Sequence, residues 1–201
     1  MFQRLTLALA LFLAVPLAGA QAQAAPPPMP ELKTIQAGDL ELAYFEEGEG
    51  PLVVLVHGFP DTPYTWVDVR PALAKAGYRV VTPYLRGYAP SGIPEDRSIV
   101  TSEAIGQDIL NLIEPLGEEE AYVLGHDWGA SAAYASATLD PEVVTKLVTV
   151  AIPHPEALEP SLGLLWKGRH FVYLSGRRGV RKMQRRDQHH VDVLYHRWAP
   201  N

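Results

Sequence analysis

One short stretch, Ala121–Ala130, constrains the fold of this chain more than any other. It runs from an apolar segment, Tyr122–Leu124, through Gly125-His-Asp-Trp-Gly129 into small helix-forming residues. This order predicts a strand that turns sharply into a helix, with glycines on both sides of the turn. The residue at the apex is Asp127, and such a turn forces its side chain into the open, where a carboxylate can act as a nucleophile.

The remaining apolar pattern alternates between strand-like and helix-like segments. Continuous apolar runs are typical of strands buried on both faces of a parallel sheet, and segments with helical spacing separate them. The predicted strands are the hairpin Leu32–Ala37 and Leu40–Glu46, followed by Leu52–Val56, Arg79–Thr82, Tyr122–Leu124 and Lys146–Ile152. The predicted helices are Trp66–Ala76, Thr101–Leu116 and Ala130–Leu139. This order predicts an α/β fold with three layers and a mostly parallel sheet.

Residues 1–24 are predicted to be an export signal. Arg4 precedes an almost wholly apolar segment, Leu5–Leu17, and two small-residue cleavage motifs follow at Ala20-Gln-Ala22 and Ala22-Gln-Ala24. That segment is shorter than the ~20 residues of a membrane-spanning helix. We therefore expect a secreted or periplasmic protein, with membrane contact only if the signal is retained as an anchor. The proline-rich residues 25–34 are predicted to form a stiff linker.

Composition narrows the range of partners. The chain has no cysteine, which excludes disulfides and thiolate chemistry. Residues 166–201 carry nine basic and two acidic residues, but no nucleic-acid motif with interleaved aromatic residues accompanies them. We interpret this basic run as a solvated helix face. The expected partner is a small-molecule substrate, with no nucleic acid, no metal and no other cofactor.

Three further motifs accompany the turn at Asp127. They are His57-Gly58-Phe59-Pro60 after a predicted strand, the loop Arg86-Gly87-Tyr88, and Ile152-Pro153-His154-Pro155 at the end of another strand. In this order the four motifs resemble the α/β-hydrolase superfamily, and within it the branch of epoxide hydrolases and haloalkane dehalogenases. The resemblance implies a hydrolase core over residues 35–154 and an incomplete helical cap that begins with residues 155–201.

The resemblance implies a two-step reaction centred on Asp127. The carboxylate would open an epoxide from behind and form an ester on the enzyme, and water would then hydrolyse that ester through a tetrahedral oxyanion. The expected oxyanion donors are the backbone N–H groups of Phe59 and Trp128. A cis bond before Pro60 would turn the Phe59 amide into the site. The expected substrate pocket comprises His57, Gly58, Pro60 and His126.

Several of these residues also have a structural interpretation. Asp127 could cap the following helix instead of attacking a substrate. His57 and His126 could serve as bases, although in the family such residues more often pack loops. Trp128 could hold a leaving halide through its indole N–H, or it could wall the pocket, which we favour.

The chain also departs from the family. Tyr84 stands where the loop around Arg86 usually has aspartate, so Arg86 is interpreted as a loop-ordering residue that lacks its usual carboxylate neighbour. The family's relay acid and histidine follow later strands beyond the cap, whereas this chain stops within the cap. We therefore expect Lys146–Ile152 to be an exposed, aggregation-prone sheet edge and the ester on Asp127 to be hydrolysed poorly.

The predicted function is hydrolysis of epoxides through an aspartyl ester. Tyr173 is the candidate for a cap tyrosine that hydrogen-bonds the epoxide oxygen, ahead of Tyr195. Three alternatives stay open: a haloalkane dehalogenase, a non-catalytic remnant that keeps the turn only as architecture, and a serine esterase using Ser131. The last is disfavoured because Ser131 lies in the helix after the turn.

Overall fold

The computed structural model describes residues 26–157 and 189–198, together with Gly163, Arg169, Gly176, Arg178, Gly179 and Arg181. The strands are β1 (Leu32–Ala37), β2 (Leu40–Glu47), β3 (Leu52–Val56), β4 (Arg79–Pro83), β5 (Ala121–His126) and β6 (Val144–Val150). The α-helices are α1 (Val69–Lys75), α2 (Ser102–Ile113), α3 (Trp128–Leu139) and α6 (His189–Trp198). Single 3-10 turns lie at Pro63–Trp66, Arg97–Ile99, Glu114–Leu116 and Pro155–Ala157. No helix in the described ranges is long and apolar enough to cross a membrane.

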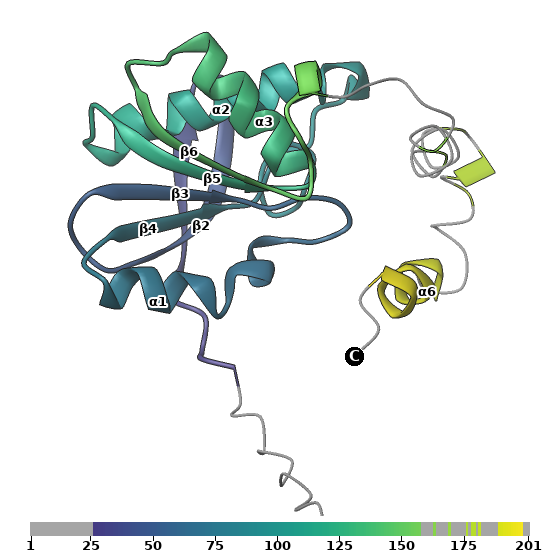
Figure 1. Cartoon of the computed structure of the whole chain (residues 1–201), viewed down its shortest axis with the longest axis horizontal. Coiled ribbons are helices and arrows are strands. Elements are labelled where there is room, and N and C mark those ends of the chain that lie inside the picture. Colours follow the sequence, from purple (N-terminus) through teal and green to yellow (C-terminus); the bar gives the residue numbers. More distant parts are fainter. Residues whose placement is uncertain are drawn as a thin grey trace, which may run out of the picture.

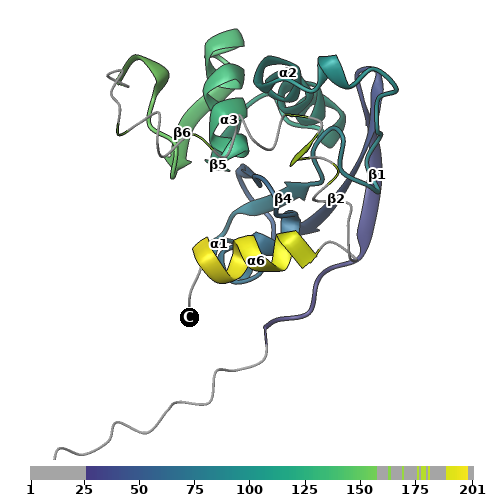
Figure 2. The same ribbon diagram turned by 90° about the vertical axis from the view of Figure 1, so that its right-hand side faces the viewer.

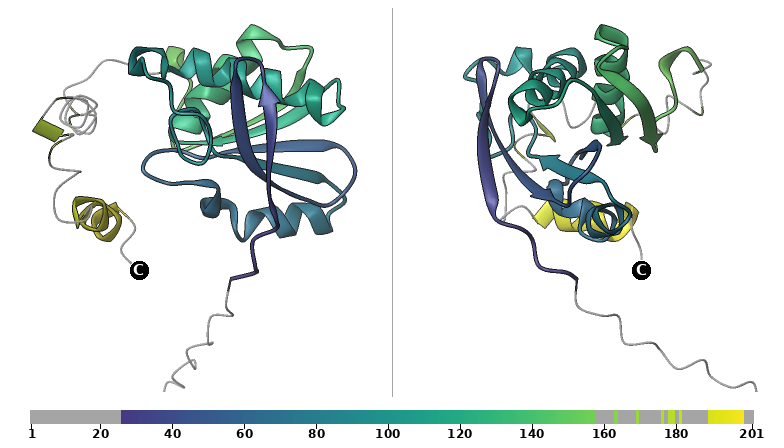
Figure 3. Two further views of the ribbon diagram at one scale, coloured as in Figure 1. Left: turned by 180° about the vertical axis from the view of Figure 1, so that it is seen from behind. Right: turned by 90° about the vertical axis from the view of Figure 1, so that its left-hand side faces the viewer.

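The six strands form one sheet in the order β1-β2-β4-β3-β5-β6. The hairpin β1–β2 and the pair β2–β4 are antiparallel, whereas β4–β3, β3–β5 and β5–β6 are parallel. Helices α2 and α3 cover one face of the sheet and α1 covers the other (Figures 1 and 3). Strands β1 and β6 lie at opposite edges (Figure 2). The predicted three-layer, mostly parallel α/β fold is therefore confirmed.

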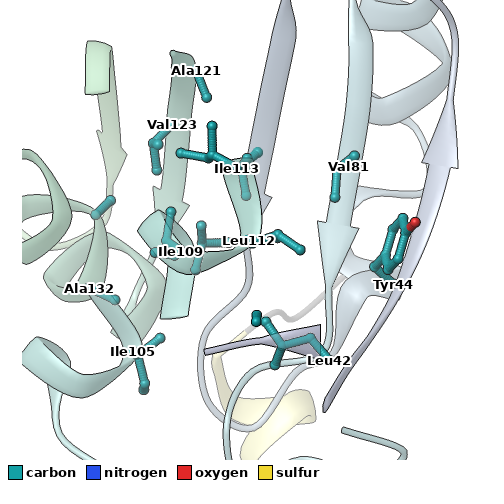
Figure 4. Packing of buried hydrophobic residues seen from close by; sticks show 14 of the residues in the cluster. Leu42, Tyr44, Val81, Ile105, Ile109, Leu112, Ile113, Ala121, Val123 and Ala132 are labelled. Atoms are coloured by element: carbon teal, nitrogen blue, oxygen red, sulfur yellow. The ribbon is translucent and has the colours of Figure 1, made fainter. Parts of the chain in front are cut away.

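The main core lies between α2 and the sheet. Thr101 caps this helix, since its Oγ1 accepts a hydrogen bond from the Ala104 N–H at 3.2 Å. Its apolar stripe points at the sheet through Ile105, Ile109, Leu112 and Ile113, opposite Val81 and Val123 (Figure 4). Each of these side chains is almost completely buried, and each contributes on the order of 1.5–3 kcal/mol to folding.

The predicted helix Trp66–Ala76 proves to be two elements. A 3-10 turn ends at Trp66, and α1 starts only at Val69. Both elements pack on the same side of the sheet, because the Trp66 ring lies in a cluster with Val53 and Leu55 of β3, and Leu73 of α1 packs against that cluster.

The segment before β1 is part of the folded body, which corrects the predicted linker 25–34. Strand β1 already begins at Leu32, which pairs with Phe45. Arg70 of α1 is completely buried and donates to the Pro28 carbonyl at 3.3 Å and to the Met29 sulfur at 3.0 Å. Its third partner is Glu47, at 2.7 Å. A buried guanidinium needs such partners, so Arg70 holds the segment with Pro28 and Met29 against the folded body.

Strand β6 fits one of the two predictions made for it: it is not buried on both faces, as its apolar run indicated, but forms the exposed sheet edge that the comparison with the family implied. It is the outermost strand, as the predicted edge required, and α1 contacts β2 and β4 instead of this end of the sheet. Leu147 packs toward the α3 side, so Val148 and Val150 point to the opposite face and are 52% and 45% exposed. A continuous apolar run therefore did not distinguish a doubly covered strand from an edge strand.

We expect Val148→Lys to reduce aggregation of this chain. The substitution places a charge on the exposed apolar face of an edge strand, which opposes pairing between copies. The free energy of unfolding should change by no more than about 0.5 kcal/mol, as for other surface positions. Light scattering across a concentration series measures the effect. Thr145→Lys, at an exposed polar position of the same strand, is the control, and equal aggregation of Val148→Lys and the wild type would contradict the expectation.

Candidate active site

Asp127 occupies a strained position at the turn between β5 and α3. Its φ of 54° and ψ of −118° lie in a region that non-glycine residues rarely adopt, at a cost on the order of 1–3 kcal/mol. Two backbone contacts hold it there: its N–H donates to the Val150 carbonyl at 3.2 Å, and its carbonyl accepts from Ala130 N–H at 3.0 Å. The turn is thus fixed from β6 and from α3.

Three glycines allow the chain to pack this tightly around Asp127. A Cβ on Gly125 would collide with the carbonyl of Gly129, and a Cβ on Gly129 would collide with the carbonyls of Val56 and His57 at the end of β3. A Cβ on Gly58 would run into the Asp127 side chain. A larger residue at Gly129 would push the turn away from β3, and one at Gly125 or Gly58 would displace the start of α3 or the Asp127 side chain.

The Asp127 carboxylate faces the loop after β3. Its Oδ1 accepts a hydrogen bond from the Phe59 backbone N–H at 2.9 Å, and the side chain makes no capping bond to α3. The helix-cap interpretation is therefore excluded. Trp128 is the first residue of α3, where a backbone N–H has no partner within the helix. The bond before Pro60 is cis, as the sequence predicted.

Two aromatic rings stand beside the carboxylate. The rings of Phe59 and Trp128 are 6.0 Å apart, tilted by 34°, and Trp128 remains 38% exposed. An exposed indole next to a second ring suits the wall of an apolar site.

His57 has a structural role and, contrary to the prediction, does not line the substrate pocket. Its ring is completely buried and packs edge-on against Tyr88, with centroids 4.8 Å apart. Nε2 accepts from the Leu85 N–H at 3.3 Å, so Nδ1 carries the proton and donates to the Gly58 carbonyl at 3.1 Å. Burial lowers the pKa of this imidazole below its ordinary value. His57 therefore links two loops. One follows β3 and carries Phe59, and the other follows β4.

His126 is the last residue of β5 and is partly buried. Its Nδ1 is buried without a hydrogen-bond partner among the described residues. No histidine in that part of the chain is hydrogen-bonded to the Asp127 carboxylate, so none has the contact expected of a base.

Arg86 does have carboxylate partners, which corrects the sequence interpretation. Nε and Nη2 bind the two oxygens of Asp108 in α2 at 2.8 and 2.6 Å, and Nη2 also reaches Asp39 at 3.0 Å. Hydrogen bonding to Asp108 raises the pKa of the guanidinium above its ordinary value. The loop-ordering role of Arg86 is therefore supported. The carboxylate that it binds comes from α2 and not from its own loop. Asp108 lies on the apolar inner face of a predicted helix, and a carboxylate there was the available signal for a buried cation.

A hollow of about 260 Å³ lies beside the turn. It opens between the start of α2, the first turn of α3 and the segment after β6. Its lining residues are Val100, Thr101, Ser102, Ile105, Trp128, Ser131 and Ile152. The predicted pocket residues His57, Gly58, Pro60 and His126 are not among them. Sequence reasoning missed this hollow because its residues come from three separated segments.

The structure thus brings Asp127, Gly58, Phe59 and Trp128 together, and it leaves other predictions untested. Tyr173 lies outside the described residues, and of Tyr195 only the backbone in α6 is described. Within the same described ranges, no cluster of three or more histidine, aspartate or glutamate side chains could hold a metal.

The sequence matches a known family over most of this region. Residues 51–181 fit the family model described as alpha/beta hydrolase fold. The chain belongs to this family. The match begins at β3 and includes the loop after that strand, the turn at Asp127 and β6.

The relatives of this chain include proteins named as epoxide hydrolases. The AB hydrolase superfamily protein YfhM of Bacillus subtilis (strain 168) is 40% identical over 120 residues, which are 60% of this chain and 42% of that protein. An epoxide hydrolase of Caballeronia sordidicola is 38% identical over 119 residues, or 59% of this chain and 36% of that protein. The chain therefore spans about two fifths of the length of these curated relatives.

Solved structures give the same likeness. An epoxide hydrolase from an endophytic Streptomyces has a TM-score of 0.60 and 39% identity, over 62% of this chain and 38% of that one. Epoxide hydrolase VrEH1 from Vigna radiata has a TM-score of 0.61 and 32% identity, over 71% of this chain and 46% of that one. The hydrolase fold inferred from the motifs is confirmed.

We expect Arg86→Met to destabilise the protein by about 3–5 kcal/mol, because it leaves the buried Asp108 carboxylate without its cation. Asp39→Asn removes only the exposed partner and should cost less than about 1 kcal/mol. Urea unfolding measures both, and the double variant Arg86→Met/Asp108→Leu should recover part of the loss. Equal losses for Arg86→Met and Asp39→Asn would show that the buried pair is unimportant.

The buried His57 should make stability depend on pH below neutrality. Its lowered pKa means that the unfolded chain takes up the proton first, at about pH 6.5. The stabilisation is complete above that pH and is lost as the pH falls toward the folded pKa, by at most about 1.4 kcal/mol per pH unit. Urea unfolding at pH 7.5 and 5.5 tests this. The deficit of His57→Asn relative to the wild type should shrink at pH 5.5, and a constant deficit would contradict it.

Proposed function

We propose that this chain carries out nucleophilic ring opening in an epoxide hydrolase. The observation that supports this proposal best is the hydrogen bond from the Phe59 N–H to the Asp127 carboxylate. Three glycines around Asp127 allow the turn to present this carboxylate. The bond orients Oδ1 and leaves the second oxygen, Oδ2, to attack carbon. The relatives named as epoxide hydrolases support this choice over other reactions of the fold.

In the first step, Oδ2 of Asp127 forms a bond to one epoxide carbon while the bond from that carbon to the ring oxygen breaks. The electron pair moves onto the departing oxygen, which then takes a proton from a neighbouring donor. The product is an ester of Asp127 with a free hydroxyl on the adjacent carbon. An aspartate is suited to this displacement because the carboxylate is already ionised at neutral pH.

In the second step, water loses a proton and its oxygen bonds to the carbonyl carbon of the Asp127 ester. The bond from that carbon to the alkyl oxygen then breaks, that oxygen takes up a proton, and the diol leaves with the carboxylate restored. Negative charge develops on the carbonyl oxygen, and two backbone donors, Phe59 N–H and Trp128 N–H, are assigned to stabilise it. Removing one donor of this type typically slows such a step on the order of 100-fold. No described histidine is hydrogen-bonded to the Asp127 carboxylate, so the described residues supply the proposed nucleophile and donors without the base.

We propose further that the protein is exported, on the strength of the apolar segment after Arg4 and the cleavage motifs that end at Ala22 and Ala24. The docking of Pro28 and Met29 on Arg70 suits a cut upstream of these residues, because the mature chain would keep both contacts.

Exposure to styrene oxide should add one molecule of the epoxide to Asp127, and the ester should persist because no histidine of the described residues is hydrogen-bonded to that carboxylate. Intact-protein mass spectrometry detects the adduct, and peptide mapping locates it. Asp127→Asn should abolish it, while Asp68→Asn, at an exposed position with no capping bond, should leave it unchanged. The mass of protein made in an export-competent host also reports a cut after Ala22 or Ala24.

Each contrary outcome has a distinct meaning. Diol release at a steady rate without an adduct would show that a base acts within this chain. An adduct with a primary alkyl bromide but none with an epoxide would favour haloalkane chemistry. Absence of any adduct on correctly folded protein would favour a non-catalytic role for the turn.

A further inference from the structure

The hollow is lined by Trp128, the residue that follows the proposed nucleophile, whereas Asp127 itself does not line it. Trp128 directly follows Asp127, and Ser131 is one helical turn further on, with its backbone N–H donating to the Asp127 carbonyl at 3.3 Å. Ile152 lies two residues after Val150, whose carbonyl accepts a hydrogen bond from the Asp127 N–H. A substrate attached at Asp127 could therefore extend past the Trp128 ring into this space.

Its size suits a substituent with one ring. An apolar cavity of about 150 Å³ is enough to bind benzene. The hollow measures about 260 Å³, which adds room for a short linker between such a ring and the reacting carbon. Ile105, Ile152 and Trp128 supply apolar walls for the ring.

Two hydroxyls in this apolar wall have no hydrogen-bond partner within the described residues. Ser131 and Ser102 are both half-buried, and neither side chain takes part in a hydrogen bond there. Other hydroxyls of α3 behave differently, since Ser136 donates to the Ala133 carbonyl at 2.9 Å and Thr138 donates to the Tyr134 carbonyl at 2.8 Å. The hydroxyls of these two lining residues are thus left to bind water or a ligand.

We propose that this hollow selects epoxides whose substituent carries a hydrogen-bonding oxygen, and that Ser131 and Ser102 make the selection. The inference rests on the proposed function of Asp127 and adds a substrate class, epoxides of the glycidyl ether type. An ether oxygen accepts a hydrogen bond from a serine hydroxyl, whereas a methylene group at the same place would leave that hydroxyl unpaired and partly desolvated.

The test uses two epoxides that differ in one atom, benzyl glycidyl ether and 5-phenyl-1,2-epoxypentane. The measured quantity is the ratio of their rate constants for alkylation of Asp127, followed by mass spectrometry. Comparison among variants cancels the intrinsic reactivity of the two epoxides. We expect Ser131→Ala, and Ser102→Ala to a smaller degree, to lower the ether preference about 3- to 10-fold.

Two further variants separate recognition from a change of fold. Ser131→Thr keeps the hydroxyl and should keep the preference. Thr138→Ala removes a hydroxyl that is already bonded within α3 and should change neither rate. An equal ether preference in the wild type and in the double variant Ser102→Ala/Ser131→Ala would overturn the inference while leaving the proposed function intact. Failure of both epoxides to alkylate Asp127 would instead overturn the proposed function, and the inference with it.

Discussion

The backbone strain at Asp127 is the constraint on which the rest of this structure depends. A non-glycine residue at a φ of 54° persists only where its surroundings leave no alternative. Here the close contact of Gly129 with the end of β3 and the hydrogen bond from the Asp127 N–H to Val150 supply that restraint. The same contacts bring β3, β5 and β6 into register at their carboxyl ends, where a ligand of such a sheet is expected.

Two buried polar groups extend this restraint to the neighbouring loops. His57 links the loop that carries the Phe59 amide to the backbone of Leu85, and Arg86 in the same segment grips Asp108 of α2. Both groups are satisfied entirely by fixed protein atoms. The site is therefore a set of loops tied to strands and helices, which is what a pre-organised donor for an oxyanion requires.

Features set by local sequence could be predicted, and features set by distant partners could not. The turn at Asp127 and the strand Leu52–Val56 follow from glycine placement and a continuous apolar run. The same kind of run misled at β6, because it does not say whether a layer lies over Val148. The partner of Arg86 was missed since Asp108 is 22 residues away and reaches it only when α2 packs on the sheet. The hollow lined by Ser131 has the same cause, because three chain segments must fold before it exists.

The hydrogen-bond partners of Arg70 determine where the folding unit begins. Judged by strands alone, the body would start at Leu32, yet a fully buried cation takes two of its three partners from Pro28 and Met29. A polypeptide beginning at β1 would enclose that guanidinium with a single, partly exposed carboxylate. The N-terminal boundary of this domain is thus set by the hydrogen-bond partners that the buried Arg70 requires and not by the first residue of the sheet.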